Sequence, residues 1–107
     1  MPKITQTAVQ RTKDRLGLSK RLAEKTAQKA LNSGIKHAEA KGSLKRYFDY
    51  LYLSHGNGNN IRVYNHNVYI FHEETLITIL PLPRKYHAVA DKLQKRRSYP
   101  DDFDPAG

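Results

Sequence analysis

The sequence contains no cysteine, so disulfide bonds and thiolate metal sites are excluded. This absence suits a reducing compartment. No apolar run approaches the roughly 20 residues that a membrane-spanning helix needs. The first ten residues, MPKITQTAVQ, also lack the apolar centre of a secretory signal. We therefore expect a soluble, cytoplasmic protein that does not enter a membrane.

The signatures of common catalytic and cofactor sites are absent as well. The chain has no nucleophile elbow, no Walker loop and no dinucleotide-binding glycine pattern. Its five histidines show neither the i, i+4 pairing nor the cysteine company of a zinc site. Glu73 and Glu74 fall in a predicted turn, where they would face solvent and not act as paired catalytic carboxylates. The sequence therefore predicts no metal and no cofactor.

Positive charge, by contrast, is abundant and unevenly distributed. The 107 residues carry 19 Lys and Arg against 10 Asp and Glu, a formal net charge of +9. Residues 1–60 hold twelve basic and four acidic side chains, whereas residues 61–83 are nearly neutral. A field of this sign attracts polyanions and raises their association rate. Nucleic acid is the favoured partner; an anionic membrane or an acidic protein is the rival, and a merely solubilising surface is the plain alternative.

Residues 61–80 are the only β-rich part of the chain. The runs IRVYN, VYIFH and TLITILPL are dense in β-branched and aromatic residues and are separated by His66-Asn67 and Glu73-Glu74. Such a pattern predicts a three-stranded antiparallel meander in which the two dipeptides form the turns. In this register Val63 pairs with Ile70, and Ile70 pairs with Ile77.

Alternation along the strands sorts the predicted sheet into two faces. One face is aliphatic and carries Ile61, Val63, Val68, Ile70, Ile77 and Ile79. The other carries Arg62, Tyr64, Tyr69, Phe71, Leu76 and Thr78, with Leu80 at its end. Two interpretations of this second face stay open. Its tyrosines either lie half-buried under a loop or helix, or form with Arg62 and Thr78 a platform for stackable bases and phosphates.

Helices are expected on both sides of this segment in the sequence. Apolar spacing predicts helices over residues 5–16, 20–33 and 44–54, and Ser19 caps the second of these. The alanine-rich second helix and the aromatic third helix are expected to pack on the aliphatic face. The linker at 35–42 is either an extra helical turn or an exposed loop. A short basic helix is expected over residues 84–97.

The sequence thus predicts one α+β domain over residues 1–97. Two or three N-terminal helices pack on the three-stranded antiparallel meander, and a short basic helix follows it. Residues 98–107 hold three Asp and no basic residue, and we expect them to form a disordered acidic tail.

Two sets of residues are candidates for function. Metal-independent RNA cleavage needs a general base, a general acid and cations for the phosphorane. Arg62, Tyr64, Tyr69, Thr78, His37 and His72 are the candidates for that chemistry. The basic side chains that we expect to contact nucleic acid are Lys20, Lys25, Lys29, Lys41, Lys45, Arg46, Arg84, Lys85, Lys95, Arg96 and Arg97.

The order of elements resembles the RelE- and barnase-like ribonuclease toxins. The similar pieces are QRTKDRLGLSKRLAEKTAQKALNSG and VYIFHEETLITILPLP, within residues 10–83. The resemblance implies cleavage of RNA on a concave sheet face without a metal, and an acidic antitoxin as a protein partner. It places Thr78, Arg62 and a histidine near the helix ends in the active site. The helix at 43–54 departs from the simplest family pattern.

A second class of function also fits the chain, which looks like small phage or mobile-element proteins. Such a protein would be a non-catalytic inhibitor that binds a host nucleoprotein complex, as anti-CRISPR proteins do. We therefore expect a basic nucleic-acid-binding protein, with RNA favoured over DNA, that is either a ribonuclease toxin or such an inhibitor.

Overall fold

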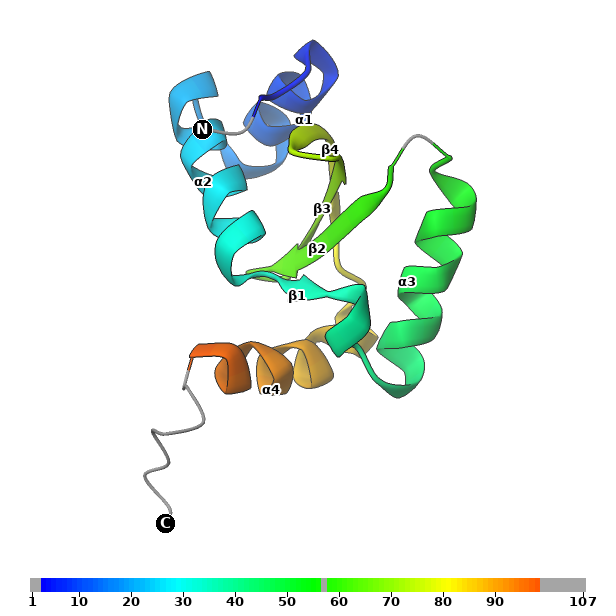
Figure 1. Ribbon diagram of the computed structural model, residues 1–107. Helices are drawn as coiled ribbons and strands as arrows, with labels where there is room; N and C mark the ends of the chain where they lie inside the picture. Colours follow the sequence, from blue (N-terminus) through cyan, green and yellow to red (C-terminus); the bar gives the residue numbers. More distant parts are fainter. Residues whose placement is uncertain (1–2, 57, 99–107) are drawn as a thin grey trace.

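An antiparallel sheet in the order β1-β2-β3-β4 runs through the middle of the molecule (Figure 1). The computed structural model describes residues 3–56 and 58–98. The strands are β1 (Ile35–Lys36), β2 (Asn60–Tyr64), β3 (Asn67–His72) and β4 (Thr75–Pro81). The helices are α1 (Gln6–Leu16), α2 (Lys20–Ser33), α3 (Gly42–Ser54) and α4 (His87–Ser98), with 3-10 turns at His37–Glu39 and Arg84–Tyr86. The α+β prediction is therefore confirmed, with one more strand than expected.

Most of the predicted acidic tail lies outside the described residues, because α4 ends at Ser98 and the description stops there. Within the described part of the chain, no helix has both the length and the apolar character needed to cross a membrane.

The second helix begins after its predicted cap, Ser19, and the first begins one residue later than predicted because Thr5 is its cap. The side chain of Thr5 accepts a hydrogen bond from the backbone N–H of Ala8, and that of Ser19 accepts one from Leu22. The predicted end of α2 at Gly34 is also confirmed, although its φ of −69° is not left-handed. A Cβ on Gly34 would lie 2.4 Å from the Ala30 oxygen. Glycine is therefore needed because the chain leaves α2 in close contact with that helix.

The linker after α2 forms the extra strand. Ile35 pairs with Val63 and Lys36 pairs with Arg62, so β1 extends the meander on the β2 side. The chain then makes the 3-10 turn at His37–Glu39, which corresponds to one of the two forms expected for the linker. A strand of two residues is too short to leave an alternating pattern in the sequence.

The first hairpin differs from its predicted register. Its turn is Asn65-His66, with φ values of 49° and 62°, and not His66-Asn67. Positive φ at both central residues is typical of the tight turns that match strand twist. Val63 consequently pairs with Val68 instead of Ile70. This shift of two residues leaves every side chain on its predicted face.

The second hairpin follows the prediction only next to its turn. Glu73 adopts a φ of 57°, and its N–H donates to the Asn59 side chain at 2.6 Å. Phe71 pairs with Leu76 as predicted, but a β-bulge then displaces the rest of β4. Pairing becomes Ile70 with Thr78 and Tyr69 with Ile79. Because a one-residue offset exchanges the faces, the predicted faces of Thr78, Ile79 and Leu80 are wrong.

Each face of the sheet is covered by a pair of helices (Figure 1). Helices α1 and α2 enclose one core, made of Ala8, Ala27, Ala30, Tyr69, Phe71, Leu76 and Ile79. The second core includes α3 and α4 side chains and consists of Ile35, Ala40, Leu44, Phe48, Leu51, Ile61, Val63, Val68, Ile70, Leu82 and Ala90. The aromatic helix α3 lies on the aliphatic face as predicted. The alanine-rich α2 does not; its small side chains fit against the bulky Tyr69 and Phe71.

Candidate nucleic-acid interface

The tyrosine face of the sheet is covered, so of the two interpretations the one with an open platform is wrong. Tyr69 is 1% exposed beneath α1 and α2, and Tyr64 is half-buried beside it. Burial, followed by the neighbouring Tyr64, raises the pKa of Tyr69 to about 12. A phenol with that pKa remains neutral and enclosed near neutral pH. The interpretation in which these tyrosines lie under a helix describes the geometry.

Arg62 lies on the same face at the edge of the α2 layer. Its Nε donates to the Asn60 side chain at 2.9 Å, and its Nη1 donates to the Leu31 carbonyl at 3.4 Å. The first bond lies within β2, and the second connects β2 with the end of α2. The guanidinium therefore has a structural position between two elements.

The other catalytic candidates lie away from this face. Thr78 is half-buried on the α3–α4 side, and His72 is exposed at the end of β3. His37 contacts the rings of Phe48 and Tyr52, and its Nε2 lies 2.6 Å from an Asp49 oxygen. The six predicted catalytic residues are thus divided between two sides of the sheet and do not converge on one site.

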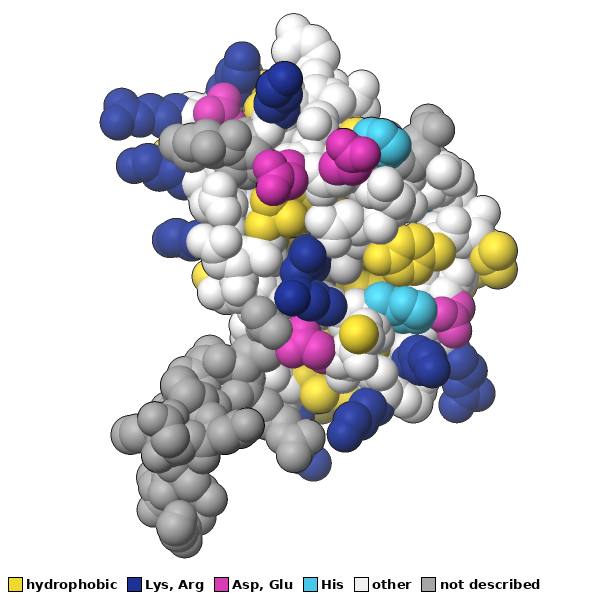
Figure 2. Space-filling view, in the orientation of Figure 1, with side chains coloured by type: hydrophobic (Ala, Val, Ile, Leu, Met, Phe, Trp, Pro, Cys, Tyr) yellow, Lys and Arg dark blue, Asp and Glu magenta, His cyan; other side chains and the backbone are white. Residues whose placement is uncertain are grey.

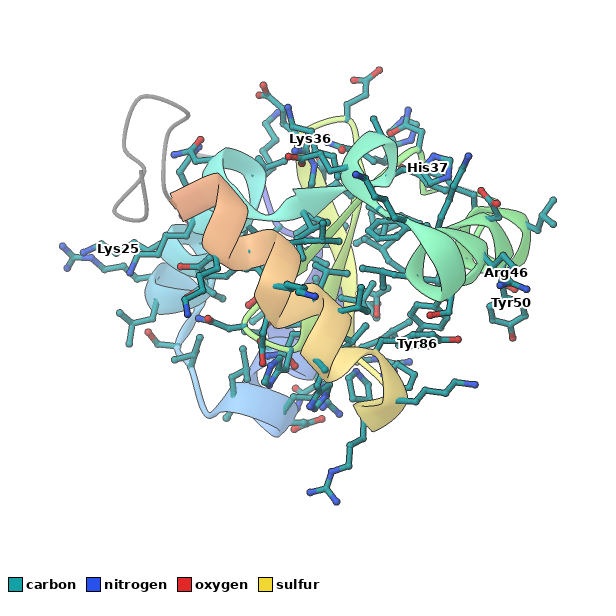
Figure 3. The ribbon with its side chains drawn as sticks, turned by 90° about the horizontal axis from the view of Figure 1, so that it is seen from below. Lys25, Lys36, His37, Arg46, Tyr50 and Tyr86 are labelled. Atoms are coloured by element: carbon teal, nitrogen blue, oxygen red, sulfur yellow. The ribbon has the colours of Figure 1, made fainter. Side chains whose placement is uncertain are left out.

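A different group of tyrosines reaches the surface where α3 meets the turn before α4. The Tyr47 and Tyr86 rings are stacked with centroids 4.8 Å apart and an interplanar angle of 25°. The Tyr50 ring continues the series, 6.4 Å from Tyr47 at 20°. We call this group, Tyr47, Tyr50 and Tyr86, the tyrosine platform. Figure 3 shows Tyr50 and Tyr86 at one end of the molecule, with Arg46 beside them.

The members of the platform differ in exposure and in role. Tyr50 is 61% exposed, whereas Tyr47 and Tyr86 are half-buried. Burial, then the nearby Tyr86 and Tyr50, raises the pKa of Tyr47. The Tyr47–Tyr86 contact joins two elements and has a packing function of its own. Tyr50 contributes little packing and presents its ring to solvent.

Cations surround these rings. The platform borders an open hollow of about 330 Å³ that is lined by Arg46, Tyr47, Tyr50, Pro83, Lys85 and Tyr86. The Lys85 Nζ lies 5.2 Å from the centroid of the Tyr86 ring, within the range of a cation–π contact. Lys45 and Arg84 are exposed next to Arg46 and Lys85 in the chain. Proteins bind single-stranded nucleic acid through aromatic rings that stack on its bases and cations that neutralise its phosphates, and both kinds of side chain are present here.

The remaining basic candidates occupy other surfaces. Lys20, Lys25 and Lys29 are exposed on α2, Lys41 is exposed just before α3, and Lys95 is exposed on α4. Arg96 and Arg97 belong to α4, but their side chains lie outside the described residues. Figure 2 shows dark blue side chains gathered in separate groups, one of them over α1 and α2.

The basic residues predicted from the sequence include the cations around this hollow, but the predicted site residues do not include its aromatic rings. The aromatic third helix is predicted only to pack on the sheet, and Tyr47, Tyr50 and Tyr86 are not among the predicted site residues. Tyr47 and Tyr50 are three residues apart on α3, directly after Lys45 and Arg46. Aromatics at i, i+3 next to paired cations were the available signal.

Comparison of the chain with protein-family models, with curated proteins and with solved structures found no match. The resemblance to RelE- and barnase-like toxins therefore stays a prediction.

Proposed function

We propose that this protein binds single-stranded nucleic acid, with RNA favoured, through the tyrosine platform and its surrounding cations. The observation that carries the proposal is the Tyr50 ring, 61% exposed and in series with Tyr47 and Tyr86, beside Arg46 and Lys85. A large exposed ring has a solvation cost that binding to a base would remove.

The platform favours unpaired bases over a duplex. In a duplex the base faces are stacked on one another, so an external ring cannot reach them. In a single strand each base has a free π-face, and stacking on an aromatic side chain is sequence-tolerant. The phenol hydroxyls support RNA over DNA because they are able to donate to or accept from a ribose 2′-hydroxyl.

The cations supply the remaining part of the recognition. Arg46 and Lys85 lie on the lining of the hollow, and the net charge of +9 draws the strand toward the protein. Phosphate contacts set the position of the strand and carry no base information. We therefore expect binding that depends strongly on salt and weakly on sequence.

The test compares substitutions at Tyr50 with a neighbouring control. Fluorescence anisotropy with an unstructured RNA of about ten nucleotides is suitable, since a small single-strand-binding module such as an OB fold covers roughly 4–16 nucleotides. Tyr50→Ala should weaken binding by about 1–3 kcal/mol, which is roughly 5- to 150-fold. Tyr50→Phe keeps the ring and should keep most of the affinity. Leu53→Ala, at an 87% exposed position of α3 outside the hollow, is the matched control and should bind as the wild type does.

The same samples distinguish binding from the other functions considered. If Tyr50→Ala and Leu53→Ala bind equally well, the platform is not the binding site. Absence of binding even at low salt would favour an acidic protein partner, such as an antitoxin or a host nucleoprotein. Gel analysis of the RNA after incubation in EDTA tests cleavage, for which a 2′,3′-cyclic phosphate end is the expected product of attack by the 2′-hydroxyl.

A further inference from the structure

Helix α2 carries a row of cations that slants along its outer side. Arg21, Lys25 and Lys29 are spaced four residues apart and are all exposed, whereas the opposite side of the helix buries Ala23, Ala27 and Ala30. Residues at i and i+4 lie one above the other on a helix. With a rise of about 1.5 Å per residue, these three positions span about 12 Å. We call Arg21, Lys25 and Lys29 the α2 row.

Helix α1, in the same layer as α2, adds further exposed cations. Arg11, Lys13 and Arg15 are exposed on α1, and the acidic residues of the two helices are Asp14 and Glu24. The two helices together thus contain seven basic and two acidic side chains. The Asp14 carboxylate accepts a hydrogen bond from Gln10, and not from a cation, in the described structure.

The α2 row differs from the platform in that neither α1 nor α2 contains a tyrosine, phenylalanine or tryptophan. Residues 1–46 contain no tyrosine, phenylalanine or tryptophan. A surface of this composition neutralises phosphates but offers no aromatic ring on which an unpaired base could stack. Duplex nucleic acid matches it, because the bases are already paired and the phosphates lie in rigid rows on the outside.

The two basic surfaces point away from each other. The α2 row belongs to the layer on one face of the sheet, and the platform belongs to the layer on the other. Figure 3 shows Lys25 at one end of the molecule and Arg46, Tyr50 and Tyr86 at the opposite end. A short strand on one surface therefore leaves the other accessible.

From this arrangement we propose that the protein bridges two nucleic-acid segments, a single strand on the tyrosine platform and a duplex on the α2 row. The proposal rests on the proposed function for its first site only. Bridging brings strands together and raises their local concentration, as in a protein that promotes annealing or compaction of structured RNA.

The test measures both partners in one solution. A donor-labelled single strand and an acceptor-labelled duplex, with no complementarity between them, are mixed with the full-length protein. Energy transfer should rise with protein concentration and fall again in excess, because separate protein molecules then occupy each nucleic acid. Anisotropy measures the binding of each nucleic acid by itself.

Variants assign each partner to its surface. Lys25→Gln/Lys29→Gln should weaken duplex binding roughly 10- to 100-fold at moderate salt, since two phosphate contacts are lost. It should abolish energy transfer and leave single-strand affinity nearly unchanged. Lys36→Gln/Lys92→Gln removes the same charge from exposed sites elsewhere and should retain both activities. Tyr50→Ala should weaken the single strand and keep the duplex.

Three results would overturn the proposal. One is mutual competition between strand and duplex without energy transfer, although each binds alone. Another is equal weakening of both nucleic acids by the Lys25/Lys29 variant, which would indicate one continuous site. The third is energy transfer only in complexes whose sedimentation shows two protein chains. Loss of the proposed function looks different, because duplex binding then persists while the single strand fails to bind the wild type.

Discussion

The two sides of the sheet use tyrosine in opposite ways. On the α1–α2 side, the large rings come from the sheet, and the helices supply alanines that are completely buried. On the α3–α4 side, the sheet supplies aliphatic side chains and α3 supplies the rings. Tyr69 is consequently enclosed at 1% exposure, whereas Tyr50 extends into solvent at 61%. The element that carries a tyrosine, and what covers that element, decides whether the ring is core or surface.

The same difference separates the two basic surfaces. Helices α1 and α2 contain no aromatic residue, so the cations on their outer sides have no ring next to them in either helix. Helix α3 contains three tyrosines and a phenylalanine, so its cations Lys45 and Arg46 lie close in the chain to Tyr47 and Tyr50. In the proposed functions, one side therefore contacts phosphates alone and the other contacts phosphates together with bases.

The largest effect is expected from truncation in the α3–α4 core. Ile70 is completely buried in β3, so Ile70→Ala should lower the free energy of unfolding by about 2–5 kcal/mol. Denaturant titration followed by circular dichroism measures this loss. Ile77→Ala, at a half-buried position of β4, is the control and should cost clearly less. A loss below about 1 kcal/mol for Ile70→Ala would contradict its place in the core.

The order of elements was predictable because it depends on local signals. Thr5 and Ser19 cap their helices, and β-branched runs mark the strands. Strand β1 and the bulge in β4 depend instead on tertiary pairing, which alternation cannot reveal. The bulge alone places Ile79 on the face opposite to the predicted one. The tyrosine face of the sheet is not open to a ligand, because the alanines of α2 pack against it.

Of the candidate nucleic-acid interface, only the positive charge was predictable from the sequence. An uneven distribution of Lys and Arg is visible in a sequence, so Arg46 and Lys85 were identified. Stacking of Tyr47 on Tyr86 joins α3 to the turn before α4, and no local pattern connects residues that distant. Burial of Tyr69 was similarly a consequence of which helix covers which face.

Salt should separate the charged and the aromatic contributions to binding. If about three phosphates of a single strand are neutralised, log K should fall against log salt with a slope of about −2. Raising the salt from about 50 to 200 mM should then weaken binding roughly 15-fold. Arg46→Ala should reduce the slope by about 0.7, whereas Tyr50→Ala should lower affinity at every salt concentration without changing the slope. Equal effects of both variants on the slope would contradict the separate roles of ring and cation.

The buried tyrosine should make stability depend on alkaline pH. Burial raises the pKa of Tyr69 from its ordinary value of 10.0 to about 12, so the folded state keeps a proton that the unfolded state releases. This stabilisation is complete below the unfolded pKa and is lost as pH rises through the folded one. Between pH of about 8 and 11, wild type should lose about 1.4 kcal/mol more than Tyr69→Phe, in which the phenol is absent. Tyr50→Phe, which leaves the Tyr69 phenol in place, is the control variant; a flat difference for Tyr69→Phe would contradict its burial.

The smallest effect is expected from the contact between the first hairpin turn and α4. The His66 Nε2 lies 2.6 Å from an Asp91 oxygen, and the His66 ring stacks on His87 with centroids 3.9 Å apart. The two side chains of the pair are 43% and 65% exposed, so water screens their attraction. Exposed pairs of this kind contribute about 0.2–1 kcal/mol, and Asp91→Asn should therefore lower the free energy of unfolding by less than about 1 kcal/mol. Denaturant titration at neutral pH measures the change, and Asp49→Asn provides a matched variant at the second His–Asp pair, where His37 is 38% exposed. A loss above about 2 kcal/mol for Asp91→Asn would mean that this contact, and not the apolar side chains of α4, holds the helix on the sheet.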